Sequence, residues 1–261
     1  MQTTSSASKV AVMSTDISIE TERGTCAAHL ALPEGSGKYP GLIVIEEIWG
    51  VDAHIKDVAE RFAREGFIVL APELLPDETI VTLTKDPQLK VDLFTPEKRE
   101  QVQPIVRDAT APIYQPEFAE GAIDKLRACV DYLVAHAQSN GKVGSIGFCF
   151  GGTYSLHLAI NDPRLDACVA LYGGAPEPLD QVAAIACPVL YLLGEKDERL
   201  MAKLPDFSAA MKEHDQVFES VVYPSVGHAF LNDTNPRTYD ADVARDAWDK
   251  AVAFLHKYLE E

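Results

Sequence analysis

KVGSIGFCFGG, residues 142–152, is the stretch that decides the fold expected of this chain. Val143 to Gly147 is a short apolar run typical of a buried strand, and Thr153 to Ile160 has the apolar spacing of a helix. Between them, G-F-C-F-G has the form Gly-x-nucleophile-x-Gly. Such a sharp strand-to-helix turn presents a reactive side chain, here Cys149, above the edge of the sheet.

The two glycines that flank this cysteine have a steric purpose. The turn forces Cys149 into strained backbone angles, and side chains at Gly147 and Gly151 would collide. The N-terminus of the following helix carries partial positive charge, which favours a thiolate. The alternative is a buried structural cysteine beside a Gly-Gly pair that serves only packing.

Outward from this turn, the chain alternates strand-like and helix-like segments. The predicted strands are Val10–Glu20 and Thr25–Leu32, joined as a hairpin, then Gly41–Ile45, Phe67–Ala71, Ala167–Tyr172, Pro188–Leu193 and Phe218–Tyr223. The predicted helices are Asp52–Arg64, Phe118–His136, Leu204–His214 and Ala241–Tyr258. Strands that are apolar on both faces predict one α/β domain over residues 1–261, with a mostly parallel central sheet and helices on both faces.

Two stretches carry weaker signals. Asp77 to Pro116 is the part least typical of regular structure, with charges, prolines and scattered apolar residues, and we expect a cap or an excursion that flanks the active site. The polar start MQTTSSASK predicts a frayed terminus.

Composition bounds the classes of function. The net charge of −17 argues against nucleic acid or an anionic membrane surface as a partner. Five cysteines, without a CxxC pair or metal-ligand spacing, favour a reducing cytoplasm and predict no metal. With no signal-like start and no long apolar run, we expect a cytoplasmic protein.

Nucleophile, acid and histidine follow one another in the order Cys149, Asp197, His228, and the last two each come just after a predicted strand. His228 would take the thiol proton or pair with the thiolate, and Asp197 would fix its tautomer. Backbone N–H groups of Phe150 and Ile48 would hold the oxyanion. The alternatives are a helix-capping Asp197 and a surface His228.

These motifs together resemble the dienelactone hydrolase (carboxymethylenebutenolidase) family of α/β-hydrolases. The resemblance runs from about Gly41 to the C-terminal helix and depends on EEIWG (46–50), KVGSIGFCFGG (142–152), GEKD (194–197), GHAF (227–230) and NDTNPRTYDADVARDAW (232–248). It implies the α/β-hydrolase fold, a triad of Cys149, Asp197 and His228, and Glu47 as a fourth polar participant.

A carboxylate at Glu47 has a physical use beside a thiol. It can accept the hydrogen bond of the resting thiol or receive its proton, and a neutral thiol resists oxidation. The alternative is that Glu47, or its neighbour Glu46, is a solvated loop acid.

The substrate is where the chain departs from the family. Members that cleave dienelactone hold its carboxylate with arginines, one of them four residues after the catalytic histidine, where this chain has Asn232. We expect Trp49 and Asn232 to contact the substrate. Arg99, Arg107 and Arg237 are candidate replacements for the missing cation, but none lies in a matching motif, and each is more typical of a surface ion pair.

The sequence therefore predicts a cysteine-dependent hydrolase of small-molecule esters or lactones that acts through an acyl thioester, without a cofactor, as a monomer or small homo-oligomer. One alternative is a protein of the same fold that binds a small molecule without turnover. A thiol redox protein is disfavoured because no resolving cysteine lies near Cys149 in sequence.

Overall fold

The computed structural model describes residues 11–260, so the start MQTTSSASK lies outside the described residues. Its strands form one sheet in the order β1-β2-β4-β3-β5-β6-β7-β8. They are β1 (Val12–Thr21), β2 (Gly24–Pro33), β3 (Tyr39–Ile45), β4 (Ile68–Pro72), β5 (Ser139–Phe148), β6 (Ala167–Leu171), β7 (Val189–Gly194) and β8 (Phe218–Tyr223). The hairpin β1–β2 is antiparallel, as predicted, and all pairs from β4 to β8 are parallel.

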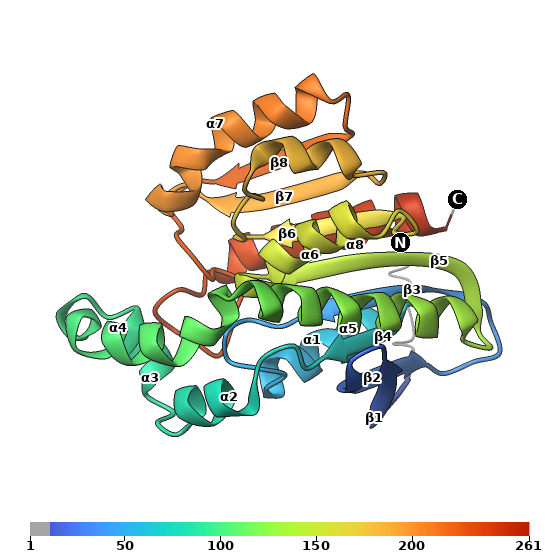
Figure 1. Cartoon of the computed structure of the whole chain (residues 1–261), viewed down its shortest axis with the longest axis horizontal. Coiled ribbons are helices and arrows are strands. Elements are labelled where there is room, and N and C mark those ends of the chain that lie inside the picture. The colour runs from blue at the N-terminus through green and yellow to red at the C-terminus, as the bar shows by residue number, and fades with distance from the viewer. Residues whose placement is uncertain (1–10, 261) are drawn as a thin grey trace, which may run out of the picture.

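Helices cover both faces of this sheet (Figure 1). They are α1 (Ala53–Arg64), α2 (Asp77–Thr84), α3 (Leu89–Leu93), α4 (Pro96–Thr110), α5 (Pro116–Ala135), α6 (Phe150–Asn161), α7 (Glu198–Glu213) and α8 (Ala241–Leu259), with short 3₁₀ turns η1 (Ala111–Tyr114) and η2 (Leu179–Ala184). Helices α5 and α6 lie in front of the sheet in this view, and α8 lies behind it. The predicted α/β-hydrolase architecture is confirmed.

Burial explains why the strands form where they do. Every residue of β4, β6 and β7 is buried, because helices exclude water from both faces of these central strands. Parallel pairing then brings the carboxyl ends of β3, β5, β6, β7 and β8 to one edge of the sheet. The loops EEIWG, GFCFG, GEKD and GHAF all leave from that edge.

The segment predicted to be irregular is mainly helical, which corrects the expectation for Asp77 to Pro116. Pro96 starts α4, where its missing N–H costs no hydrogen bond. A small apolar cluster separate from the main core then fixes the helices: Trp49, Leu83, Leu89 and Val106. Tertiary burial against the EEIWG loop, rather than long periodicity, specifies these helices, so a sequence pattern did not reveal them.

Candidate active site

Cys149 occupies the turn between β5 and α6 with φ of 57°, a strained conformation for a residue with a side chain. A Cβ at Gly147 would lie 1.9 Å from the carbonyl oxygen of Gly151, and one at Gly151 would lie 2.2 Å from the carbonyl oxygen of Ile45. Only glycine fits either position. The positive φ of Cys149 confirms the predicted strained backbone of the turn. The cysteine is half-buried at the N-terminus of α6.

Asp197 and His228 meet although 31 residues separate them. Nδ1 of His228 lies 2.5 Å from Oδ2 of Asp197. The two loops approach closely, because a Cβ at Gly194 would lie 2.4 Å from the carbonyl oxygen of Gly227. Oδ1 of Asp197 also accepts a 3.5 Å bond from the N–H of Leu200, so one carboxylate caps α7 and orients the imidazole.

The charges of this pair support each other. Burial is the largest single influence on the pKa of His228, and it lowers that pKa. The charge of Cys149 and the hydrogen bonds of His228 with Asp197 and Cys149 outweigh burial and raise the pKa to about 10. Burial acts to raise the pKa of Asp197, but the hydrogen bond to His228 and the charge of His228 oppose it, and the pKa of Asp197 is lowered. The raised pKa of His228 favours its protonated form beside the carboxylate of Asp197.

Glu47 is a buried acid, not a solvated one, with 3% of its surface exposed. Its Oε2 accepts a hydrogen bond of 2.5 Å from Nδ2 of Asn232, while its Oε1 is buried without a hydrogen-bond partner. Burial raises the pKa of Glu47, against the opposing charges of His54 and Lys90 and the bond from Asn232. Cys149 is among the groups that raise the pKa of His228.

Glu46 points into a different part of the molecule. Its Oε1 accepts hydrogen bonds of 2.8 Å from the N–H of Leu74 and 2.9 Å from the N–H of Leu75. Complete burial raises its pKa to about 8, although these two bonds oppose the shift. Glu46 thus ties the loop after β4 to the EEIWG loop, and it is not a surface acid.

Two aromatic rings that the sequence reasoning missed lie near the histidine. The ring centroid of Tyr172 lies 5.2 Å from that of His228, and the Tyr172 hydroxyl is fully buried without a hydrogen-bond partner. The ring of Phe94, the residue after α3, is stacked relative to that of His228, with 6.4 Å between the ring centroids and an interplanar angle of 13°. The position of Tyr172 directly after β6 was the one available signal. Phe94 had none, because its helix was not predicted.

The remaining candidates occupy different surroundings. Phe150 directly follows Cys149, and Ile48 lies in the loop after β3, which are the positions expected of oxyanion donors. Phe150 is 8% exposed. Trp49 is 6% exposed and packs in the apolar cluster beneath α2 and α4. Asn232 is 1% exposed, and its Oδ1 accepts bonds from both the N–H and the hydroxyl of Thr234.

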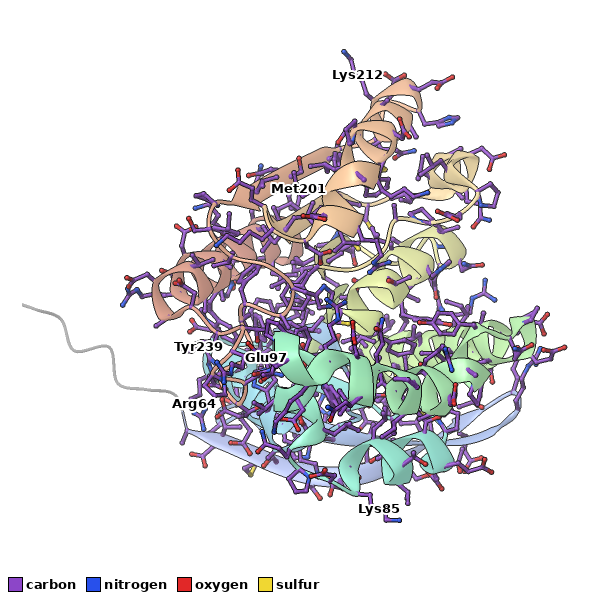
Figure 2. All side chains as sticks on the ribbon, turned by 90° about the vertical axis from the view of Figure 1, so that its left-hand side faces the viewer. Arg64, Lys85, Glu97, Met201, Lys212 and Tyr239 are labelled. Atoms are coloured by element: carbon purple, nitrogen blue, oxygen red, sulfur yellow. The ribbon has the colours of Figure 1, made fainter. Side chains whose placement is uncertain are left out.

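None of the three candidate arginines lies buried beside the triad. Arg99, Arg107 and Arg237 are all exposed, and Arg107 pairs with its neighbour Asp108. The lysine among the groups whose charge lowers the pKa of Glu47 is Lys90 of α3. Its Nζ lies 2.8 Å from Oδ2 of Asp52 and 5.4 Å from the centre of the Trp49 ring. Figure 2 views the molecule from the side that carries α4, with Glu97 of that helix facing the viewer.

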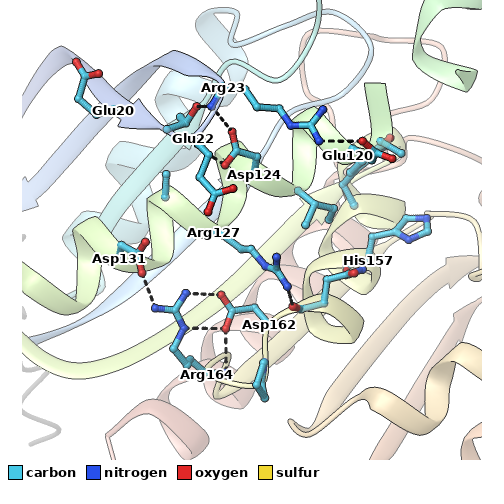
Figure 3. Close-up of a pocket in the computed structure, with 17 residues that line it drawn as sticks. Glu20, Glu22, Arg23, Glu120, Asp124, Arg127, Asp131, His157, Asp162 and Arg164 are labelled. Atoms are coloured by element: carbon cyan, nitrogen blue, oxygen red, sulfur yellow. Dashed lines mark hydrogen bonds and ion pairs between the residues drawn. The ribbon is translucent and has the colours of Figure 1, made fainter. Parts of the chain in front are cut away.

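A broad groove on another face is lined by none of the triad residues (Figure 3). It lies between the β1–β2 turn, α5 and the end of α6, and two of its arginines form ion pairs. Arg23 contacts Glu120, and Arg164 contacts Asp162. The buried polar atoms that lack hydrogen bonds lie elsewhere in the described residues. Cys149, Asp197 and His228, rather than this groove, therefore mark the candidate site.

Residues 11–260 contain no cluster of three His, Cys, Asp or Glu side chains suited to a metal ion. Over the same residues, no helix is long and apolar enough to cross a membrane.

Comparisons with known proteins agree on one family. The model of the dienelactone hydrolase family matches residues 26–259. A candidate carboxymethylenebutenolidase of Saccharolobus solfataricus is 32% identical over 94% of this chain and 99% of its own length. A Bradyrhizobium protein named as a probable 2-oxo-3-(5-oxofuran-2-ylidene)propanoate lactonase is 29% identical over 93% of this chain and 94% of its own. The crystal structure of a candidate dienelactone hydrolase from Klebsiella pneumoniae superposes with a TM-score of 0.78 at 25% identity, covering 95% of this chain and all of that one.

Proposed function

This chain belongs to the dienelactone hydrolase family and is an ester or lactone hydrolase, and from that premise we propose that Cys149 is its nucleophile. The observation that carries the proposal is the strained Cys149 at the start of α6, close to a His228 whose Nδ1 is held by Asp197. A thiolate paired with an imidazolium is nucleophilic at neutral pH.

The reaction then proceeds in two steps. The Cys149 sulfur attacks the carbonyl carbon, and the N–H groups of Ile48 and Phe150 hold the oxyanion. The ester C–O bond breaks, the leaving oxygen takes a proton from His228, and an acyl thioester remains. A water molecule gives a proton to His228 as its oxygen attacks the thioester, and the acid product leaves the regenerated thiolate.

Activated esters and lactones fit this machinery better than amides, because their leaving oxygens need less help from a proton donor. We propose a small-molecule substrate that enters beside Phe94, with the segment 77–116 forming a wall of the pocket. All five cysteines are free thiols, which supports a reducing, cytoplasmic setting for a thiol enzyme. We expect a monomer or a small homo-oligomer.

The test is pre-steady-state hydrolysis of a chromogenic ester, with mass spectrometry of the quenched enzyme. We expect a burst of chromophore and an added acyl mass on the peptide that contains Cys149. Cys149→Ala should abolish both. The matched control is Cys187→Ala, since that thiol is buried before β7, at the opposite end of the strand from Asp197. A Cys149→Ala variant with normal turnover would contradict the proposal. Wild-type protein that binds the ester without releasing product would contradict it too.

A further inference from the structure

A chain of hydrogen bonds joins helix α3 to the buried carboxylate of Glu47. Nζ of Lys90 donates to Oγ1 of Thr234 at 3.4 Å, and the Thr234 hydroxyl donates to Oδ1 of Asn232 at 2.6 Å. Nδ2 of Asn232 in turn donates to Oε2 of Glu47 at 2.5 Å. Each link is a direct contact between side chains, and together the links form a relay from α3 to the loop after β3.

Every donor in this relay points the same way. The relay begins at an ammonium group, which can only donate, and it ends at a carboxylate, which accepts. The one proton of the Thr234 hydroxyl is used on Asn232, so the oxygen keeps its lone pairs for Lys90. The backbone N–H of Thr234 also donates to Oδ1 of Asn232, at 3.0 Å. A flip of the Asn232 amide would break these bonds and the bond to Glu47, so the amide has one stable orientation.

Lys90 is itself held in place by two further contacts. Its Nζ lies 2.8 Å from Oδ2 of Asp52, which balances part of its charge. Its backbone carbonyl accepts a 3.3 Å hydrogen bond from Nδ2 of Asn235, a residue that is 1% exposed. The Lys90 side chain is only 15% exposed, and shielding from water strengthens such bonds. The relay therefore starts from a fixed cation.

Glu47 needs such support because it is buried. A carboxylate away from water is costly unless hydrogen-bond donors or cations compensate its charge. Burial raises the pKa of Glu47, and the charge of Lys90 and the bond from Asn232 are among the influences that oppose the rise. Glu47 directly precedes Ile48, the proposed oxyanion donor, so its placement bears on the reaction.

We propose that Lys90 is a positioning residue of this hydrolase, which fixes the carboxylate of Glu47 through Thr234 and Asn232. The proposal rests on the proposed function for the reaction that Glu47 serves. Lys90 acts through the relay, and hydrogen bonds that run in one direction strengthen one another. A break at any link therefore loosens the Asn232 amide and, with it, the carboxylate.

The test follows the side-chain amide of Asn232 by ¹H–¹⁵N NMR, with Asn232→Gln to assign its signals. Lys90→Met keeps the length of the side chain and removes the ammonium group. We expect it to speed the exchange of the amide protons with solvent about fivefold, the factor that corresponds to one net hydrogen bond. The kcat for the chromogenic ester should fall by about the same factor, with KM little changed.

A second variant breaks the relay at its middle. Thr234→Val removes the hydroxyl at similar volume, and it should have the same two effects as Lys90→Met. In the double variant the effects should not multiply, because both substitutions interrupt one relay. If Lys90→Met does not fold, Lys90→Leu, which also lacks a donor, takes its place.

The matched control is Lys98→Met in α4. Lys98 pairs with Asp92 at 3.0 Å, and among the described residues its hydrogen bonds go to Asp92 alone. This variant should leave both the amide exchange and kcat unchanged. An equal effect of Lys98→Met would overturn the inference, because it would show a general loosening of the segment.

Three other outcomes would also overturn the inference. They are unchanged exchange in folded Lys90→Met, unchanged kcat in that variant, and effects that multiply in the double variant. The exchange measurement needs no substrate, so it is independent of the test of the nucleophile. Normal turnover in Cys149→Ala would refute the nucleophile and leave the result for Lys90 as measured.

Discussion

The amide Nδ2 of Asn232 donates a 2.5 Å hydrogen bond to Oε2 of Glu47, across 185 residues of chain. The other end of the amide is held by Thr234. Position 232 is therefore occupied by a contact within the protein. A cation at this position would instead meet a buried carboxylate directly, so the identity of residue 232 affects both Glu47 and the substrate.

Asn232→Arg tests the missing cation. We expect the ratio of kcat/KM for a carboxylated lactone to that for its methyl ester to rise about tenfold, which is about 1.4 kcal/mol of transition-state discrimination. Because Asn232 is buried, the larger side chain should also lower the free energy of unfolding by about 2 kcal/mol.

The neutral control for that experiment is Asn232→Gln, which enlarges the residue without adding charge. Its substrate ratio should stay close to that of the wild type. We expect the wild type itself to prefer the neutral ester. A tenfold preference for the anion in the wild type would contradict this prediction and would direct attention to Lys90.

Asp197→Asn should lower kcat by about 10³-fold or more, because asparagine can present an N–H to His228 and favour the wrong tautomer. Thermal stability should change little, since asparagine caps a helix about as well as aspartate. Steady-state kinetics and calorimetry check the two expectations. Asp206→Asn, an exposed site on the same helix α7, is the control and should retain full activity. Normal kcat in Asp197→Asn would remove Asp197 from the triad.

Gly147→Ala should destabilise the protein by several kcal/mol, because its Cβ would meet the carbonyl oxygen of Gly151 at 1.9 Å. Gly121→Ala in α5 is the opposite case, since a Cβ there meets nothing within 4 Å. That change should stabilise the protein by about 0.5–1 kcal/mol. Urea unfolding measures both, and equal effects of the two substitutions would refute the steric account of the turn.

Glu46 should make stability depend on pH. Burial raises the pKa of its carboxyl from the ordinary value for glutamate to about 8 in the folded protein. The folded state therefore holds this proton more tightly, and the contribution is fully present below the unfolded pKa. It is lost as pH rises through about 8, with a total on the order of a few kcal/mol.

Glu46→Gln removes this titration and keeps an acceptor for Leu74 and Leu75. We expect the variant to be more stable than the wild type at pH 9 and to show a flatter curve of unfolding free energy between pH 5 and 9. Glu47, whose pKa is also raised, leaves part of the slope in place. Parallel curves for variant and wild type would contradict the prediction.

Local sequence determined the sheet and the elbow. Apolar runs specify the strands wherever both faces are buried, and Gly147 and Gly151 are required because no side chain fits the turn at Cys149. The order of the motifs predicted the meeting of Asp197 and His228, since parallel strands bring their carboxyl ends to one edge. These features depend on near neighbours in the chain or on a topology with few alternatives.

Tertiary structure alone decided what surrounds the triad. Trp49 is placed by a small apolar cluster whose members come from several elements, and Phe94 packs against the main core. No periodic pattern encodes either position. Asn232 was expected to meet substrate, yet its partner is Glu47, far away in the chain. Burial and hydrogen bonding between distant side chains depend on how elements pack, so the burial of Glu47 and its raised pKa could not be predicted from local composition.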